Sequence, residues 1–74
     1  MHQTENDLYY DALHKCIIAG GLLNHTLSVY KVDGRLILSH FINEDAELIY
    51  IGNLPEGIYI VKAFDEKLKM VIKD

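Results

Sequence analysis

The sequence predicts an all-β domain, because short apolar segments alternate with turn signals at a short and fairly even spacing. The segments between the turns are rich in Val, Ile, Leu and Tyr, most of which favour strands. The turn signals are Gly20-Gly21, Asp33-Gly34, Asn43-Glu44-Asp45, the stretch from Asn53 to Gly57, and Asp65-Glu66. Several short strands at this spacing are typical of a sandwich or a barrel.

The length and composition indicate a single folded domain over residues 1–74. Half of the residues are hydrophobic, and five Tyr and two Phe add large apolar side chains. A disordered chain carries less apolar material than this, so we expect the chain to fold. The polar residues 1–6 are expected to form a disordered N-terminal tail.

The first third of the chain fits two readings. One is a helix that Thr4 caps and Gly20 ends, with apolar residues from Leu8 to Ile17 at helical spacing. The other is a pair of strands over residues 7–12 and 15–19, favoured by the β-forming residues in Tyr9-Tyr10 and in Cys16-Ile17-Ile18. The periodicity alone leaves both readings open.

A hairpin is expected over residues 26–42. Asp33-Gly34 lies between two apolar runs and predicts a two-residue type I′ turn, which needs a positive φ at both central positions. Pairing that is symmetric about residues 33 and 34 places His40 opposite about position 27. The run 35–42 is apolar on both faces near its middle, as a partly covered central strand would be.

The segment from Pro55 to Phe64 predicts a turn followed by another strand. Pro55 presets its own φ, and Gly57 can adopt the left-handed conformation that completes the turn. In the strand, alternation assigns Ile58, Ile60 and Phe64 to one face, and it assigns Tyr59, Val61 and Ala63 to the other.

The last segment has the cleanest period of two. Along this strand Leu68, Met70 and Ile72 alternate with Lys67, Lys69 and Lys73, so one face is apolar and the other is solvated. We predict a core made of Ile17, Leu27, Val29, Leu36, Leu38, Leu48, Ile58, Ile60, Leu68, Met70 and Ile72.

The charge balance argues against two classes of partner. The net charge is −4 and the pI about 5.4, with seven basic residues spread along the chain. Nucleic acid is therefore not an expected partner, because phosphate recognition needs a basic surface. A polybasic membrane anchor is not expected either, and no apolar stretch reaches the ~20 residues of a membrane span.

No motif points to catalysis, a cofactor or a metal. The four histidines lack the spacing of a zinc site, and Ser28 and Ser39 lie outside any nucleophile motif. Cys16 has no second cysteine to pair with, so we expect it to be a small buried hydrophobic residue. We therefore predict that the domain is not an enzyme.

Two stretches of the chain resemble a known family. One runs from Leu27 through Asp33-Gly34 to Leu38, and the other reads Asn-Leu-Pro-Glu-Gly-Ile-Tyr-Ile-Val-Lys from Asn53 to Lys62. Together with the terminal lysine-bearing strand, they resemble the C-terminal sorting domain of type IX secretion cargo. The resemblance covers residues 26–74. The family's usual Tyr-Pro-Asn-Pro opening is replaced here by Tyr9-Tyr10-Asp11-Ala12.

The resemblance implies a seven-stranded, antiparallel, Ig-like β-sandwich at the end of an exported protein. It also implies recognition by an outer-membrane secretion machine, often followed by removal of the domain. Gly57, Tyr59 and the lysines of the last strand match the family's signature positions, so we expect recognition to involve Gly57, Tyr59, Lys67, Lys69 and Lys73. Asp33, Gly34, Pro55 and Gly57 are the expected structural turn residues.

The leading functional prediction is a non-catalytic sorting or anchoring module that protein partners recognise. The alternative is a stand-alone or accessory β-sandwich, an interaction or structural module without a secretion role that could associate with itself through strand edges. We expect a secreted or cell-surface location if the chain is a piece of an exported protein, and a cytoplasmic one if it is complete as written.

Overall fold

The computed structural model describes residues 7–73, which form seven strands. They are β1 (Asp7–Asp11), β2 (Cys16–Gly20), β3 (Thr26–Lys31), β4 (Leu36–Phe41), β5 (Ala46–Tyr50), β6 (Gly57–Ala63) and β7 (Glu66–Ile72). The expected disordered tail, residues 1–6, lies outside the described residues. The first third of the chain is therefore two strands, joined by a turn over residues 12–15, and not a helix.

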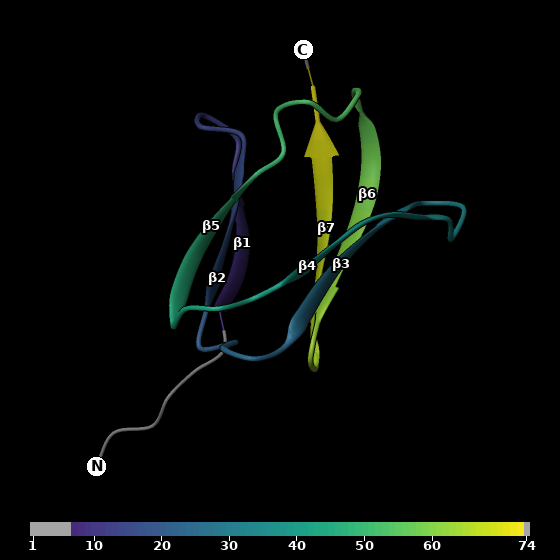
Figure 1. The fold of residues 1–74 in the computed structure, drawn as a ribbon. Coiled ribbons are helices and arrows are strands. Elements are labelled where there is room, and N and C mark those ends of the chain that lie inside the picture. Colours follow the sequence, from purple (N-terminus) through teal and green to yellow (C-terminus); the bar gives the residue numbers. More distant parts are fainter. Residues whose placement is uncertain (1–6, 74) are drawn as a thin grey trace.

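The strands form two antiparallel sheets that face each other (Figure 1). One sheet has the order β1-β2-β5, and the other has the order β4-β3-β6-β7. β1 lies against β7, which brings the two sheets together along one side. The prediction of an all-β sandwich with seven short antiparallel strands is confirmed.

The fourth strand determines how the seven strands divide between the sheets. In a constant-type immunoglobulin sandwich, the fourth strand joins the sheet of the first, second and fifth. Here β4 pairs with β3 instead, so the sheet that contains β3, β6 and β7 gains the extra strand. The larger sheet consequently has the broader outer face.

A single apolar layer fills the space between the sheets. Its buried members are Ile17, Ala19, Leu22, Leu27, Val29, Ile42, Ile49, Ile51, Tyr59, Val61, Ala63, Met70 and Ile72. The predicted core residues Ile17, Leu27, Val29, Met70 and Ile72 are confirmed. Leu38, Ile60 and Leu68 are half-buried.

Three predicted core residues point outward instead. Leu36 is 54% exposed, Leu48 is 66% exposed and Ile58 is 42% exposed. On β5, Ile49 faces the core opposite Ile17, so its neighbour Leu48 must point to solvent. Alternation along a strand permits only one of two neighbours to enter the core.

The prediction of which face of β6 enters the core is wrong. Tyr59 pairs with Met70, and Val61 pairs with Leu68, so the odd-numbered residues of β6 share the core face of β7. Ile58 and Ile60 consequently lie on the outer face. Phe64, predicted to share a face with them, lies beyond the end of β6, where its ring centroid is 4.4 Å from that of His25.

The β3–β4 hairpin has a longer loop than the predicted two-residue turn. The amide of Gly34 donates to the carbonyl of Lys31 (2.8 Å), and the amide of Lys31 donates to the carbonyl of Arg35 (2.8 Å). Within this loop, Gly34 alone has a positive φ (+96°), whereas a type I′ turn would require one at Asp33 as well. The loop is therefore a three-residue connection that ends in glycine.

A bulge then restores the predicted register. Tyr30 pairs with Leu36, but Val29 pairs with Leu38, so Ile37 is an extra residue on β4. Because of this insertion, Leu36 and Leu38 point to opposite faces despite being two residues apart. Leu27 pairs with His40, as the symmetric pairing predicted.

The turn before β6 lies slightly earlier than predicted. The amide of Leu54 donates to the carbonyl of Ile51 (3.0 Å), so the hydrogen-bonded turn precedes Pro55. Gly57 is the first residue of β6 and has a φ of +157°, which is far more extended than the expected left-handed conformation.

Two neighbouring residues of β7 test the assignment of faces. Met70 is 1% exposed and Val71 is 44% exposed. We expect Met70→Ala to lower the free energy of unfolding by roughly 2–5 kcal/mol, because it leaves a cavity between the sheets. The control Val71→Ala should change it by less than about 0.5 kcal/mol. Urea denaturation measures both, and equal losses would contradict this assignment.

Candidate recognition surface

The outer face of β6 and β7 gathers the lysines of the C-terminal third. Across these strands Ile58 pairs with Val71, Ile60 with Lys69, and Lys62 with Lys67, and all of these residues lie on the side away from the core. Lys73 follows β7 and is exposed. We call this surface the lysine face, and its members are Ile58, Ile60, Lys62, Lys67, Lys69, Val71 and Lys73.

The lysine face is positively charged on an acidic molecule. It holds four of the seven basic residues of a chain whose net charge is −4. On the same side of the sheet, β3 and β4 contribute only uncharged residues: Thr26, Ser28, Tyr30, Leu36, Ser39 and Phe41. No carboxylate therefore faces the lysines from the paired strand positions of this sheet.

Like charges directly opposite each other are a feature of this face. Lys62 and Lys67 are partners across β6 and β7, an arrangement that disfavours pairing of the strands. The Nζ atom of Lys62 lies 5.6 Å from the centroid of the Tyr30 ring, a cation–π contact that offsets part of the repulsion. The lysines are thus not arranged for stability alone.

A shallow hollow borders the lysine face. It has a volume of about 250 Å³ and is lined by Tyr30, Lys31, Val32, Gly34, Ile60 and Lys62. Small-molecule sites are usually enclosed and larger, about 300–1,000 Å³. The hollow, which Val32 and Ile60 line together with Lys31 and Lys62, is smaller and shallower than such a site.

Tyr59, a predicted recognition residue, is buried beneath this surface and only 1% exposed. Its hydroxyl donates a hydrogen bond to the carbonyl of Pro55, four residues earlier (2.6 Å). A tyrosine at the start of the sixth strand that bonds back to the preceding segment resembles the tyrosine corner of immunoglobulin-type sandwiches. Any contribution of Tyr59 to recognition would therefore act through the segment that it holds.

A polar contact joins the two sheets at the side opposite β1 and β7. The Nε2 atom of His40 on β4 contacts the Oε2 atom of Glu47 on β5, and the backbone amide of Asn43 donates to the other carboxylate oxygen (2.8 Å). The hydrogen bond with His40, followed by that from Asn43, lowers the pKa of Glu47 below its ordinary value. Sequence reasoning missed this pair, because the two residues come together only when the sheets pack.

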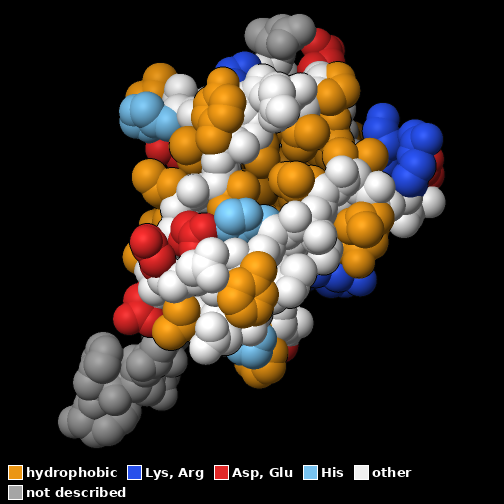
Figure 2. All heavy atoms as spheres, in the orientation of Figure 1, with side chains coloured by type: hydrophobic (Ala, Val, Ile, Leu, Met, Phe, Trp, Pro, Cys, Tyr) orange, Lys and Arg blue, Asp and Glu red, His pale blue; other side chains and the backbone are white. Residues whose placement is uncertain are grey.

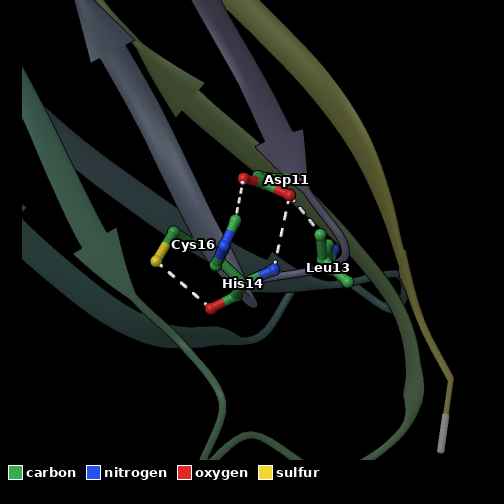
Figure 3. Close-up of polar contacts among 4 residues, drawn as sticks. All are labelled: Asp11, Leu13, His14 and Cys16. Carbon is green, nitrogen blue, oxygen red and sulfur yellow. Dashed lines mark hydrogen bonds and ion pairs between the residues drawn. The ribbon is translucent and has the colours of Figure 1, made fainter.

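The turn between β1 and β2 contains a second acidic residue in contact with histidine (Figure 3). One oxygen of Asp11 accepts hydrogen bonds from the amides of Leu13 (3.1 Å) and His14 (3.3 Å), and the other lies 2.8 Å from the His14 Nδ1 atom. The side-chain hydrogen bond with His14 is the main cause of the lowered pKa of Asp11. The Sγ atom of half-buried Cys16 donates to the His14 carbonyl (3.3 Å). These contacts order the turn.

The remaining polar groups do not converge on a reactive centre. Within residues 7–73, no three His, Cys, Asp or Glu side chains lie close enough to hold a metal ion. His14, His25 and His40 contact Asp11, the Phe64 ring and Glu47 respectively, in three separate places. His25 and His40 do not contact each other in any described interaction.

Comparison with models of protein families identifies the family of this chain. The model of the secretion system C-terminal sorting domain matches residues 14–73. The chain belongs to this family. These domains are C-terminal sorting signals for type IX secretion, which confirms the resemblance read from the hairpin, the Gly57–Tyr59 segment and the last strand. No curated protein and no solved structure matches the chain.

The matched span locates the features of the sorting domain. It contains the whole lysine face, Tyr59 and the contact between His40 and Glu47, whereas β1 precedes it. The stretch where the family's usual opening motif is absent thus lies outside the match. No helix long and apolar enough to cross a membrane occurs in the part of the chain that the structure describes.

The Tyr59 hydrogen bond can be tested directly. Tyr59→Phe removes the donor of the part-buried hydrogen bond to the Pro55 carbonyl and should lower the free energy of unfolding by roughly 1 kcal/mol. The control Tyr50→Phe removes a hydroxyl from a side chain that is 67% exposed and should have little effect. Urea denaturation followed by circular dichroism provides the measurement. A Tyr59→Phe protein as stable as the wild type would refute the role of this bond.

The lowered pKa of Glu47 predicts a pH-dependent contribution to stability. Because the folded pKa lies below the ordinary value of 4.5, the contribution is complete above that pH and is lost as the pH falls through the folded pKa. The difference in the free energy of unfolding between the wild type and Glu47→Gln should therefore be widest at neutral pH and shrink as the pH falls below 4.5. Glu44→Gln, at an exposed position, is the control. A gap that does not change with pH would contradict the prediction.

Proposed function

We propose that this domain is the sorting and anchoring module of an exported protein, and that the secretion machinery recognises it through the lysine face. Membership of the sorting-domain family supports the general role. The clustering of Lys62, Lys67, Lys69 and Lys73 on one face of an acidic domain is the observation that supports the surface.

The chemistry of the lysine face fits a protein partner. Ile58 and Val71 are large apolar residues, 42% and 44% exposed, that a partner could cover. The surrounding lysines would attract an acidic patch and orient the encounter, since complementary charge raises association rates and selects partners. Recognition of this kind breaks no bond, so we propose a non-enzymatic role.

Gly57 and Tyr59 have a positioning role in this proposal. Tyr59 holds Pro55 through its hydroxyl, and a side chain on Gly57 would lie 3.7 Å from the Tyr59 ring. Their effect on recognition would come from the shape of the segment leading into β6. The parent protein would be secreted or displayed at the cell surface. The family offers no support for the cytoplasmic alternative.

A reporter fusion tests the lysine face. Residues 1–74 are attached to a periplasmic reporter in a host that has the type IX system. We expect the wild-type fusion to reach the surface and Lys67→Ser/Lys69→Ser to reduce the surface fraction several-fold, because two of the steering charges are lost. The variant should remain folded, since both side chains are exposed.

A matched control removes the same charge elsewhere. Lys15→Asn/Arg35→Ser changes two basic residues that lie outside both the lysine face and the hollow, and should leave delivery close to the wild-type value. Asn suits position 15, where φ is +56°. Circular dichroism of each purified domain separates a recognition defect from unfolding. A wild-type fusion that never reaches the surface would rule out the sorting role. Equal delivery by both double variants would rule out the lysine face.

The alternative is an accessory or structural sandwich without a secretion role. The specific observation in its favour is an uncharged strand, β4, at the end of the larger sheet, where another chain could pair with it. A module of this kind would pair with another chain through this edge, and its reporter fusion would stay in the periplasm. Retention of the fusion is the outcome that distinguishes it from a sorting module, because pairing through β4 is compatible with both roles.

A further inference from the structure

The four edge strands of the two sheets differ in how well they are protected against pairing with another chain. β1 and β7 lie against each other, and β7 carries lysines along its length. β5 contains Glu47 and follows directly on Glu44 and Asp45. β4, with the sequence Leu-Ile-Leu-Ser-His-Phe, contains no lysine, arginine, carboxylate or proline, the usual means by which an edge strand avoids pairing with another chain.

The backbone of β4 has peptide groups available at this edge. The amide of Ile42 donates to the carbonyl of His25, and the carbonyl of Ile42 accepts from the amide of Asn24, so both groups point towards the β3 side. In an antiparallel pair, consecutive residues direct their peptide groups alternately to one side and the other. Phe41 and Ser39 therefore direct theirs away from β3, where a further strand would lie. The Phe41 carbonyl accepts a long hydrogen bond there from the Asn43 side-chain amide (3.4 Å), which pairing with a second copy would replace.

We propose that two copies of this chain pair through β4, antiparallel, with Ser39 of one copy opposite Ser39 of the other. The two four-stranded sheets then become one eight-stranded sheet with a two-fold axis at Ser39. This inference goes beyond the sorting role and does not depend on it. The bulge at Ile37 limits the pairing to a short segment, so the dimer should be reversible.

The charges at the two ends of β4 favour a second copy of the chain as the partner at this edge. Arg35 precedes the strand, and Glu44 and Asp45 follow it shortly afterwards; all three are exposed. Figures 1 and 2 place the β3–β4 loop beside a cluster of basic side chains and the β4–β5 connection beside acidic ones. A two-fold axis at Ser39 brings the basic end of each copy to the acidic end of the other. An isologous interface needs this self-complementarity.

The side chains that this register places opposite each other are also compatible with pairing. Ile37 of one copy lies opposite Phe41 of the other, and these residues are 37% and 50% exposed in the single chain. Both become covered in the dimer. Because the axis is perpendicular to the sheet, the two lysine faces lie on the same side, so a dimer would offer two recognition surfaces to one partner.

The residue on the two-fold axis permits a charge-exchange experiment on the full chain. Light scattering and sedimentation equilibrium measure the dimer dissociation constant of the wild type, Ser39→Lys and Ser39→Glu. We expect each variant alone to dimerise more weakly by roughly fivefold or more, because like charges then face each other across the axis. An equimolar mixture of the two variants should regain dimerisation, since the opposite charges now pair.

Leu13→Lys is the matched control, because it adds the same charge at a position that is 84% exposed and remote from β4 in the β1–β2 turn. It should dimerise as the wild type does. Circular dichroism verifies that all variants are folded. The proposal is overturned if the wild type stays monomeric up to about 1 mM, or if Ser39→Lys and Leu13→Lys dimerise equally well. It is also overturned if the mixture fails to recover.

Discussion

The structure depends on one apolar layer that both sheets share. Residues such as Ile17 from the smaller sheet and Val29, Val61 and Met70 from the larger one fill it together. A chain of 74 residues has no second core to compensate for a failure of this one. Each strand therefore buries one of its two faces in this layer, and the side chains of its other face must point outward.

The outer surface of the sorting domain follows from this constraint. Once Tyr59, Val61 and Met70 occupy the core, Lys62, Lys67 and Lys69 must lie together on the outside of the same sheet. Their mutual repulsion works against the pairing of β6 and β7. A sequence selected only for stability would be expected to place a carboxylate among them. The lysines of β7 also protect that edge strand from pairing with another chain, but Lys62 lies on the inner strand β6 and has no such role. The basic face therefore points to a requirement beyond the fold.

Much of this could be predicted from the sequence, and the failures have physical causes. The alternation of Lys67, Lys69 and Lys73 with apolar residues identified the solvated side of β7 correctly, because only one face could be buried. β6 is apolar on both sides, so its orientation is set by its register with β7, which no local pattern reveals. The choice of Ile58 over Tyr59 for the core followed from that ambiguity, and Lys62 was missed as a member of the site.

Other features depended on geometry that a sequence pattern does not encode. Gly34 signalled a hairpin, but the three-residue loop and the bulge at Ile37 were needed together to give the observed register. The contact between His40 and Glu47 joins residues on different sheets and appears only after packing. Sequence reasoning was reliable for strand positions and unreliable for contacts between sheets.

The central claim is that the lysine face is the side that the secretion machinery recognises, and site-specific photo-crosslinking during export tests it most directly. A photoreactive residue is placed at Lys69 on the lysine face or at Leu48, which is 66% exposed on the outer face of the other sheet. We predict crosslinks to components of the machinery from position 69 and few from position 48. Crosslinks from position 48 alone would contradict the account.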